Sequence, residues 1–511
     1  MRFAPAMRYL LFAAAGALLA VTALAGEQEF CVAGTVLNGV TGEVLRRAAV
    51  TLPESAVLTD AAGAFRFCQL PAGTYSANAE KPGFAEAGSR VVVGPSRENL
   101  VLRLQPLSAI TGKVSDGAAE PLQSVLIQLL SIRIAEGRRH VRVAFTAVTD
   151  DRGEYRLARI PPGRYYLRAA GWAAAPSDRD PRESFAPAYY GGAPTLASAS
   201  LVTIEPGHDI QADLDVSLRP AYPIQGEIAG FSPLLPAQVE LLGADREPSA
   251  APVALDAATG KFRIDGVTVG SYILRATQGD GAARRRGELP LQVDAALNGI
   301  ALPLYGGVTL RGNVRMAADF DRAESSSPAC AIKISAMDAW SPDEPALEAS
   351  TEPSGEFELQ NVPPGRYRLR MECAGGYLSA LHLGDVDLLA DGELSIPPGL
   401  APAPVDAVLS ADGGTLQVTA SAEGEPGPGW LLLLPASGSE LHTRLARLIA
   451  KYTFSGIAPG DYQVYAWSGS PEAFEYADPD ARQAWAARAA SVHIGGGDRQ
   501  SIAVRVAGDK P

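Results

Sequence analysis

Histidine and cysteine are scarce in this chain of 511 residues, which contains five of the first and four of the second. The two closest histidines, His442 and His493, are 51 positions apart, whereas zinc enzymes use ligands at local spacing such as His-Glu-x-x-His. Only His382 with Asp385 approaches such a pair, in a segment typical of a strand that runs into a turn. A Gly-x-Ser-x-Gly nucleophile elbow is also missing. We therefore expect no catalytic residue, no metal and no cofactor.

Positive charge is also in short supply, since 44 Lys and Arg face 57 Asp and Glu and give a net charge of −13. Nucleic acids and anionic membrane surfaces both need clustered cations, so neither is an expected partner. Beyond the N-terminus the sequence has no apolar run of the roughly 20 residues that a transmembrane span needs. The partner that remains is a protein or a glycan of unknown identity.

The N-terminus has the pattern of a secretory signal peptide. Arg2 and Arg8 precede an apolar stretch from Tyr9 to Ala20, and Ala23-Leu-Ala25 offers the small residues at which signal peptidase cuts. We expect cleavage before Gly26 and export to the periplasm, the cell surface or the medium.

Internal repeats decide the fold class. Five segments share an ending with glycine and tyrosine, at intervals of 90, 107, 95 and 95 residues between the tyrosines. The endings are Leu70-Pro-Ala-Gly-Thr-Tyr75, Ile160-Pro-Pro-Gly-Arg-Tyr165, Val267-Thr-Val-Gly-Ser-Tyr272, Val362-Pro-Pro-Gly-Arg-Tyr367 and Ile457-Ala-Pro-Gly-Asp-Tyr462. The interval is the length of one small domain.

Two more elements accompany each ending. A Gly-x-Val-like strand opens the copies, as in Gly34-Thr-Val36, Gly112-Lys-Val114, Gly226-Glu-Ile228, Gly312-Asn-Val314 and, without the glycine, Thr415-Leu-Gln-Val418. An acidic turn with glycine and an aromatic residue precedes the endings of copies 1 to 4, as in Thr59-Asp-Ala-Ala-Gly-Ala-Phe65. The fifth copy keeps only Tyr452-Thr-Phe454 of this turn.

These elements follow the physics of β-hairpins. In Asp-x-x-Gly the aspartate caps its own turn and the glycine takes the positive-φ position. The alternating apolar and polar residues that follow are typical of half-buried strands, and the tyrosine ring can fill the core while its hydroxyl finds a backbone partner. The residues with these turn and corner roles are Asp60, Gly63, Gly73, Tyr75, Asp150, Gly153, Gly163, Tyr165, Gly270, Tyr272, Gly355, Gly365, Tyr367, Gly460 and Tyr462.

The combined pattern resembles the carboxypeptidase regulatory-like module, in copies 1, 2 and 4 above all. That resemblance implies a transthyretin-like (prealbumin-like) sandwich close to the starch-binding, carbohydrate-binding-like folds. The arrangement is also similar to that of large bacterial secreted proteins with several such modules, most of which have no assigned activity.

We therefore predict an all-β fold: a tandem array of about five immunoglobulin-like or prealbumin-like β-sandwich modules with one short helix near the C-terminus. The helix is expected after Asp478 as N-cap and Pro479 as first helical residue. The predicted ranges are 1–25 (signal peptide), 26–107 (module 1), 108–219 (module 2, with a loop insertion at 172–200), 220–303 (module 3), 304–410 (module 4) and 411–511 (module 5).

The four cysteines fall in two pairs, each inside one predicted module. Export permits disulfides, and four cysteines allow three connectivities. We favour Cys31 with Cys68 and Cys330 with Cys373, because the other two connectivities must join distant modules.

The least generic segment is the insertion of module 2, which contains Trp172, Phe185, Tyr189 and Tyr190 among Pro, Gly and Ala. Long loops in compact domains are often functional, and exposed rings stack well on sugars or on a protein partner. The alternative is that these rings pack the insertion onto the sandwich or against module 3. If the chain has a ligand, we expect it here.

Two functions agree with these features. The first is a non-catalytic secreted or cell-surface binding or scaffold protein made of carboxypeptidase regulatory-like modules. The second is a carbohydrate-binding protein that uses the starch-binding-like sandwich.

Overall fold

The computed structural model describes residues 29–95, 99–174, 180, 182–317, 329–338, 340, 345–421, 429–506 and 508. The predicted signal peptide and its cleavage site lie outside the described residues. The chain divides into two compact units, residues 1–107 (unit 1) and 108–511 (unit 2), and we describe each by itself. The predicted module numbers serve below as labels, and the module boundaries stay a prediction.

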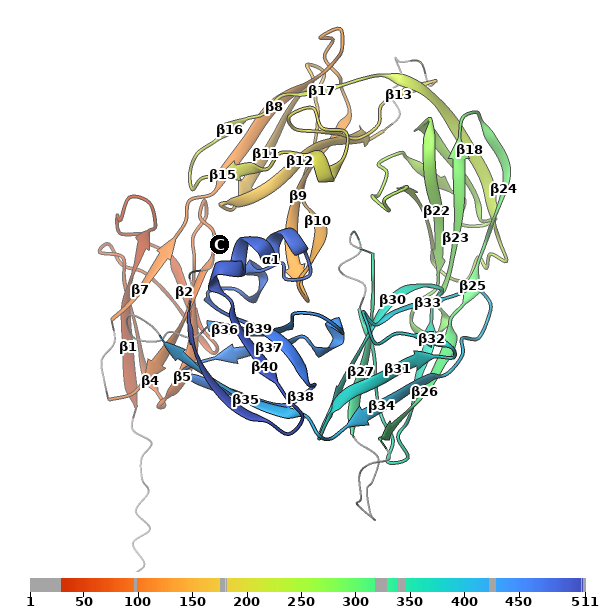
Figure 1. The fold of residues 1–511 in the computed structure, drawn as a ribbon. Helices are drawn as coiled ribbons and strands as arrows, with labels where there is room; N and C mark the ends of the chain where they lie inside the picture. The colour runs from red at the N-terminus through yellow and green to blue at the C-terminus, as the bar shows by residue number, and fades with distance from the viewer. Residues whose placement is uncertain are drawn as a thin grey trace, which may run out of the picture. The chain divides into compact units, whose positions relative to one another are not determined.

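One strand pairing recurs five times along the chain (Figure 1). The first strand of each copy lies between an antiparallel strand, which follows the acidic turn, and a parallel strand near the end of the copy. The strand that begins at the conserved ending pairs in a second sheet. Two sheets with a buried apolar layer between them make each copy a β-sandwich, which confirms the predicted all-β fold class.

Unit 1 shows the pattern in its simplest form. Its sheets have the orders β4-β1-β7 and β3-β2-β5-β6, and Cys31–Cys68 joins β1 to β4. The strands are β1 (Phe30–Asn38), β2 (Ala49–Leu52), β3 (Ser55–Leu58), β4 (Ala64–Leu70), β5 (Gly73–Glu80), β6 (Ala87–Val93) and β7 (Asn99–Leu104).

The glycine of the opening strand has a steric reason. Gly34 of β1 lies opposite Phe65 of β4, and a Cβ on Gly34 would stand 2.2 Å from the Leu100 carbonyl oxygen and 2.4 Å from the Phe65 ring. Copies 2, 3 and 4 repeat this glycine–aromatic pair in the same register. In module 5, Leu416 takes the place of the glycine opposite Phe454. Any side chain at this position would collide with the aromatic ring and with the neighbouring strand, so the position requires glycine.

Module 2 differs from the others in the length of one hairpin. Strands β9 and β10 have 11 residues each, and their turn is Glu136 and Gly137, both with positive φ. The elements are β8 (Ser108–Asp116), β9 (Val125–Ala135), β10 (Arg138–Val148), β11 (Glu154–Ile160), β12 (Gly163–Trp172), β13 (Glu183–Ser184), β14 (Ala188–Tyr189), η1 (Leu196–Ser198), β15 (Val202–Ile204), β16 (Ile210–Gln211) and β17 (Leu214–Val216).

Modules 2 and 3 exchange backbone hydrogen bonds. Strand β13 of the insertion pairs with β18, so part of the insertion belongs to a sheet of module 3. The elements of module 3 are β18 (Arg219–Ala229), β19 (Ala237–Gly243), β20 (Val253–Leu255), β21 (Lys261–Thr268), β22 (Gly270–Gln278), η2 (Gly281–Ala283), β23 (Arg285–Val293) and β24 (Leu297–Pro303). The short β25 (Tyr305–Gly306), predicted to belong to module 4, pairs with β23.

Module 4 carries the second disulfide, Cys330–Cys373, between directly paired residues of β27 and β30. Its sheets have the orders β29-β26-β34-β31-β32 and β28-β27-β30-β33. The strands are β26 (Val308–Met316), β27 (Cys330–Ala336), β28 (Leu347–Ser350), β29 (Glu356–Val362), β30 (Gly365–Cys373), β31 (Tyr377–Leu383), β32 (Val386–Asp387), β33 (Glu393–Ile396) and β34 (Val405–Ser410).

Module 5 contains the predicted helix. It begins at Pro479, and the Asp478 side chain caps it by accepting from the Asp480 N–H. Its Trp485 packs with Trp467 and Phe474 in a second small core. The elements are β35 (Gly414–Ser421), β36 (Gly429–Pro435), η3 (Glu440–His442), β37 (Arg444–Leu448), β38 (Lys451–Ile457), β39 (Gly460–Ser468), η4 (Pro471–Ala473), α1 (Pro479–Trp485), η5 (Ala486–Arg488), β40 (Ala490–Ile494) and β41 (Arg499–Arg505).

Candidate binding cavities at the module junctions

The predicted turn residues stand at hairpin turns. In unit 1 the Asp60 Oδ1 accepts from the N–H groups of Ala62 and Ala64, both at 2.8 Å, and Gly63 has φ of 69°. Asp150 accepts from Arg152 and Glu154 in the same way in module 2. Each of these carboxylates is engaged by its own turn.

The five tyrosines of the repeated ending form a corner. The hydroxyl groups of Tyr75, Tyr165, Tyr367 and Tyr462 donate to the carbonyl oxygen four residues earlier, at 2.8 to 3.1 Å. Tyr272 instead bonds the Thr268 hydroxyl at 2.9 Å. The corner fixes the turn that precedes each tyrosine strand.

The insertion of module 2 is not an exposed aromatic surface. Trp172, Phe185 and Tyr189 are 6%, 4% and 1% exposed, and the partly buried Tyr190 packs against the module core. Trp172 and Phe185 contact edge to face at 5.0 Å. Of the two possibilities, packing is the one observed, because the insertion pairs with β12 through β14 and with β18 of module 3 through β13.

Arg168 of β12 lies at the centre of this packing and is 1% exposed. Its guanidinium pairs with Glu247 of module 3, donates to Gln128 at 2.7 Å and lies 5.0 Å from the centre of the Trp340 ring of module 4. Tyr189 donates to the same Glu247 at 2.7 Å, and burial raises the pKa of Tyr189 to about 12. This buried charge could not be predicted from the sequence, since an arginine in an alternating strand is typical of a surface position.

A cavity of about 380 Å³, which we name the insertion cavity, lies between the insertion and module 3. Rings of Trp172, Phe185 and Tyr272 line it, together with Pro187 and Pro194. Tyr189 and Tyr190 do not. The structure thus brings two of the four predicted ligand residues to one cavity and leaves the other two in packing positions.

The β9–β10 hairpin contacts modules 4 and 5 through its charged side chains and its tip. Three arginines of the hairpin pair with glutamates of module 5: Arg133 with Glu472 at 2.8 Å, Arg138 with Glu440 at 2.8 Å and Arg139 with Glu475 at 2.6 Å. At the tip, Gly137 accepts a hydrogen bond from the Ala477 N–H.

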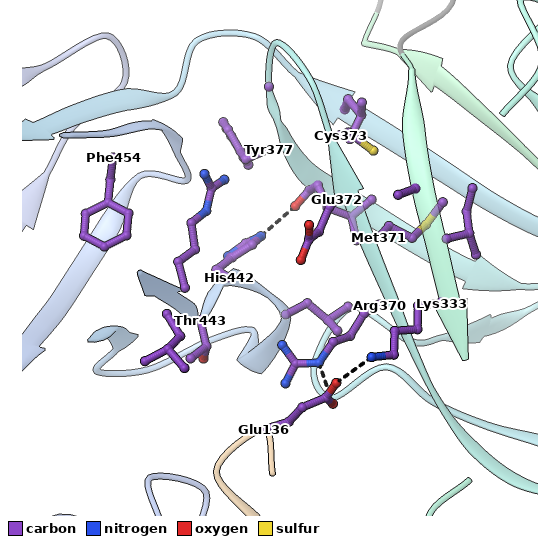
Figure 2. Close-up of a pocket in the computed structure, with 18 of the residues that line it drawn as sticks. Glu136, Lys333, Arg370, Met371, Glu372, Cys373, Tyr377, His442, Thr443 and Phe454 are labelled. Atoms are coloured by element: carbon purple, nitrogen blue, oxygen red, sulfur yellow. Dashed lines mark hydrogen bonds and ion pairs between the residues drawn. The ribbon is translucent and has the colours of Figure 1, made fainter. Parts of the chain in front are cut away.

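Glu136 extends the contact of the hairpin to module 4. Its carboxylate lies 3.0 Å from Arg370 Nε and 3.5 Å from Lys333 Nζ, and Figure 2 shows it reaching both side chains. One hairpin therefore connects three modules of unit 2.

Modules 3 and 4 are joined by four charged residues, which we name the joint cluster: Arg246, Arg275, Glu288 and Asp338. Arg275 is buried and lies 2.8 Å from both carboxylates. Burial opposes the ionisation of Asp338, but hydrogen bonding from Arg275 and its charge outweigh burial and lower the pKa of Asp338. For Glu288, burial is likewise outweighed by the bond from Arg246 and the charge of Arg275.

The largest cavity described, about 890 Å³, lies between modules 4 and 5 beside the hairpin tip, and we name it the junction cavity. Figure 2 shows Lys333, Arg370 and Met371 on one side and His442, Thr443 and Phe454 on the other. Its floor includes strands β27, β28 and β30, and module 5 contributes the edge strands β37 and β38.

Two basic groups of the junction cavity are held by main-chain oxygens. His442 Nε2 donates to the Leu378 carbonyl at 2.7 Å, and burial lowers its pKa. Arg444 donates to the carbonyl groups of Ser455 and Gly456, and burial lowers the pKa of this guanidinium too. In the described part of the chain, His442 has no hydroxyl or thiol partner that it could activate as a base.

Within the described ranges, no cluster of three or more His, Cys, Asp or Glu side chains is placed to bind a metal ion. The helices found in the same ranges are all too short or too polar to cross a bilayer.

The sequence was compared with known proteins. Residues 32–105 match the family model described as the carboxypeptidase regulatory-like domain. No curated protein matches the sequence.

Similar solved structures include a Streptococcal ancillary pilin, at 12% identity over 54% of this chain and 99% of that chain, with a TM-score of 0.19. The minor pilin GBS52 of Streptococcus agalactiae has 15% identity over 37% of this chain and 97% of that chain, with a TM-score of 0.21. BcpA, the major pilin subunit of Bacillus cereus, has 10% identity over 75% of this chain and 99% of that chain, with a TM-score of 0.17. At these TM-scores the likeness carries no argument about function. The match over residues 32–105 confirms that module 1 is similar to the carboxypeptidase regulatory-like domain.

Proposed function

We propose that the chain is an exported, non-catalytic scaffold protein that binds a protein or glycan partner at the junctions between its modules. The observation that carries this proposal is the β9–β10 hairpin, which connects modules 2, 4 and 5 through ion pairs of Arg133, Glu136, Arg138 and Arg139. Modules that moved independently of one another would not keep such ion pairs.

Further contacts support a fixed arrangement inside unit 2. The Arg168–Glu247 pair fastens module 2 to module 3, and the joint cluster fastens module 3 to module 4. Module 5 contacts module 4 through Ser439, whose hydroxyl donates to the Leu389 carbonyl. Cavities between modules then keep their shape, and a preformed site costs less ordering on binding than a flexible one.

Export is supported by the predicted signal peptide and by the two disulfides, which persist in oxidising compartments. The junction cavity favours binding over catalysis, since its His442 and Arg444 side chains are held by main-chain carbonyl groups.

The arrangement can be tested with the mature full-length protein. Limited proteolysis should cut between the two units and leave a resistant fragment near residues 108–511. The double charge reversal Arg133→Glu and Arg139→Glu should expose new cleavage sites between the modules. Arg142→Glu is the matched control, because Arg142 lies exposed on the same hairpin and makes no ion pair with a described residue. Cleavage of the unaltered protein into single modules would contradict the proposal.

The binding role needs its own assay. Thermal shifts of the mature protein against panels of soluble glycans and peptides should identify a ligand, and Tyr377→Ala and Tyr452→Ala at the junction cavity should abolish its binding. Binding that both variants retain would place the ligand elsewhere.

A specific observation also favours the carbohydrate-binding alternative. Trp172, Phe185 and Tyr272 line the insertion cavity, and aromatic rings in a cavity suit the apolar faces of sugars. Pro194→Trp at its exposed rim should block glycan binding on an array. Leu400→Trp, which adds the same ring at an exposed position of module 4, should not. Equal glycan signals from both variants would exclude this cavity.

A further inference from the structure

A second, smaller cavity lies beside the hairpin tip, and we name it the arginine cavity. It measures about 130 Å³, the space of roughly four water molecules. The hairpin, strand β30, the loop at 434–440 and the start of α1 surround it. Its charged lining consists of four arginines and two glutamates: Arg138, Arg368, Arg370, Arg482, Glu136 and Glu440.

The carboxylates of this lining do not balance its guanidinium groups. Glu440 pairs with Arg138 at 2.8 Å. Glu136 pairs with Arg370, but Lys333 shares the same carboxylate from the junction cavity. Each carboxylate is therefore engaged, and none is left over for the other two arginines.

Arg368 is the most deeply buried member of this set. Its guanidinium lies 2.7 Å from Glu393, which also pairs with Arg366 at 3.1 Å. Burial and then the positive charge of Arg138 lower the pKa of Arg368. A neighbouring like charge inside a cavity is unfavourable unless an anion compensates for it.

Arg482 of α1 forms no ion pair with any residue that the structure describes, although it is half-buried in the cavity wall. The nearest acidic residue, Asp480, is exposed and does not line the cavity, and the two before it are engaged elsewhere. Glu475 pairs with Arg139, and Asp478 caps α1. The cavity thus has an excess of positive charge in a chain whose net charge is −13.

We propose that the arginine cavity binds a small tetrahedral oxyanion, phosphate or sulfate. The planar guanidinium group donates two parallel hydrogen bonds to such an anion, and arginines on three modules converge on a volume of matching size. The anion neutralises the repulsion between Arg138 and Arg368 and supplies a partner for Arg482. The arginine cavity shares Glu136, Arg370, Thr443 and Tyr476 with the junction cavity. The inference still does not rest on the proposed function, because its test uses phosphate alone and needs no glycan or protein ligand.

A bound anion also adds to the contact between modules 2, 4 and 5. Because it binds the assembled unit and not the separated modules, it stabilises unit 2 by a free energy that grows with the logarithm of the phosphate concentration above the dissociation constant. Phosphate should therefore raise the melting temperature of unit 2 and leave that of unit 1 unchanged.

The test is isothermal titration calorimetry of the mature protein with inorganic phosphate, at an ionic strength held constant with sodium chloride. We expect one saturable site with a millimolar or tighter dissociation constant, competition by sulfate and none by acetate. Arg482→Gln should weaken binding at least tenfold, and Arg482→Lys should restore part of it. Arg142→Gln is the matched control, because Arg142 lies exposed on the β9–β10 hairpin that borders the cavity, does not line the cavity and makes no ion pair with a described residue.

A second variant tests the site independently, in case Arg482→Gln does not fold. Ser437→Asp places a carboxylate at the exposed rim of the cavity and should abolish phosphate binding without disturbing the core. Absence of saturable binding to the unaltered protein would overturn the proposal. Equal weakening by Arg482→Gln and Arg142→Gln would overturn it as well, and so would acetate that binds as tightly as phosphate.

Discussion

Replacing Gly34 by alanine should destabilise unit 1 more than any other single methyl group added to it. A Cβ at this position would stand 2.2 Å from the Leu100 carbonyl oxygen and 2.4 Å from the Phe65 ring. The ring could tilt, but Leu100 belongs to the backbone of β7, which pairs with β1 along its length. The strand itself must move to make room.

The magnitude follows from two opposing effects. Alanine restricts the unfolded chain and stabilises by about 0.4–1 kcal/mol where its conformation is unstrained. Overpacking costs about 1–3 kcal/mol when the neighbours can shift, and a backbone neighbour places Gly34→Ala at the upper end. We expect a net loss of about 2 kcal/mol, which corresponds to roughly 8–16 °C in the melting temperature of a domain of this size.

Unit 1 can be followed separately in the full-length protein. The five tryptophans are at positions 172, 340, 430, 467 and 485, all in unit 2. A calorimetric transition without a change in tryptophan fluorescence therefore belongs to unit 1. Gly34→Ala should lower the temperature of this transition alone.

Gly94→Ala is the control, because a Cβ on Gly94 would meet no atom within 4 Å. We expect its melting temperature to equal or slightly exceed that of the unaltered protein. If the two variants melt at the same temperature, the close approach of β1 and β7 does not require glycine at position 34. The steric explanation of the Gly-x-Val motif would then be wrong.

Three further outcomes are expected. Tyr367→Phe should cost unit 2 about 1 kcal/mol or more, since it leaves a buried carbonyl group unpaired, whereas Tyr75→Phe at the exposed corner of unit 1 should cost less in the same calorimetric assay. Arg168→Met should cost about 3–5 kcal/mol by denaturant unfolding because Glu247 is left buried and unpaired, and adding Glu247→Met should recover most of it. The pKa values of the joint cluster carboxylates are lowered, so their contribution to the stability of unit 2 is present above the ordinary pKa near 4 and is lost as the pH falls further. The melting temperature of unit 2 should therefore decrease below about pH 4. The decrease should be smaller in a variant with both carboxyls replaced by amides.

Much of the fold could be predicted because each repeated motif solves a local steric problem. Gly34 meets Phe65 across one ladder, Asp60 closes its own turn, and Tyr75 bonds a carbonyl group four residues away. Such contacts lie within one module, so their spacing in the sequence is constant. The helix after Asp478 was predictable for the same reason, since its cap and its proline are adjacent.

The contacts between modules could not be predicted in this way. Arg168 and Glu247 are 79 positions apart, and Glu136 and Arg370 are 234 apart, with no repeat to relate them. The sequence left exposure and packing of the insertion rings open for the same reason, because an aromatic residue in a Gly- and Pro-rich loop is exposed only if no neighbouring module covers it. The segment that forms the β9–β10 hairpin is unusually long, but its local sequence does not specify which modules the hairpin contacts.

The charged residues at the junctions can prevent the wrong modules from packing together, which is a risk in a chain of repeats. Five sandwiches that share one strand pairing offer similar surfaces, and repeat proteins are prone to misassembly between domains. A purely apolar junction would tolerate several partners, whereas a buried charge that meets the wrong partner costs about 3–5 kcal/mol. Among the described elements, the hairpin with two strands of 11 residues belongs to module 2. Three of its arginines pair with glutamates of module 5 that lie in or next to η3 and η4. The ion pairs thus select one arrangement of modules 2 to 5, and the cavities between the modules exist only in that arrangement.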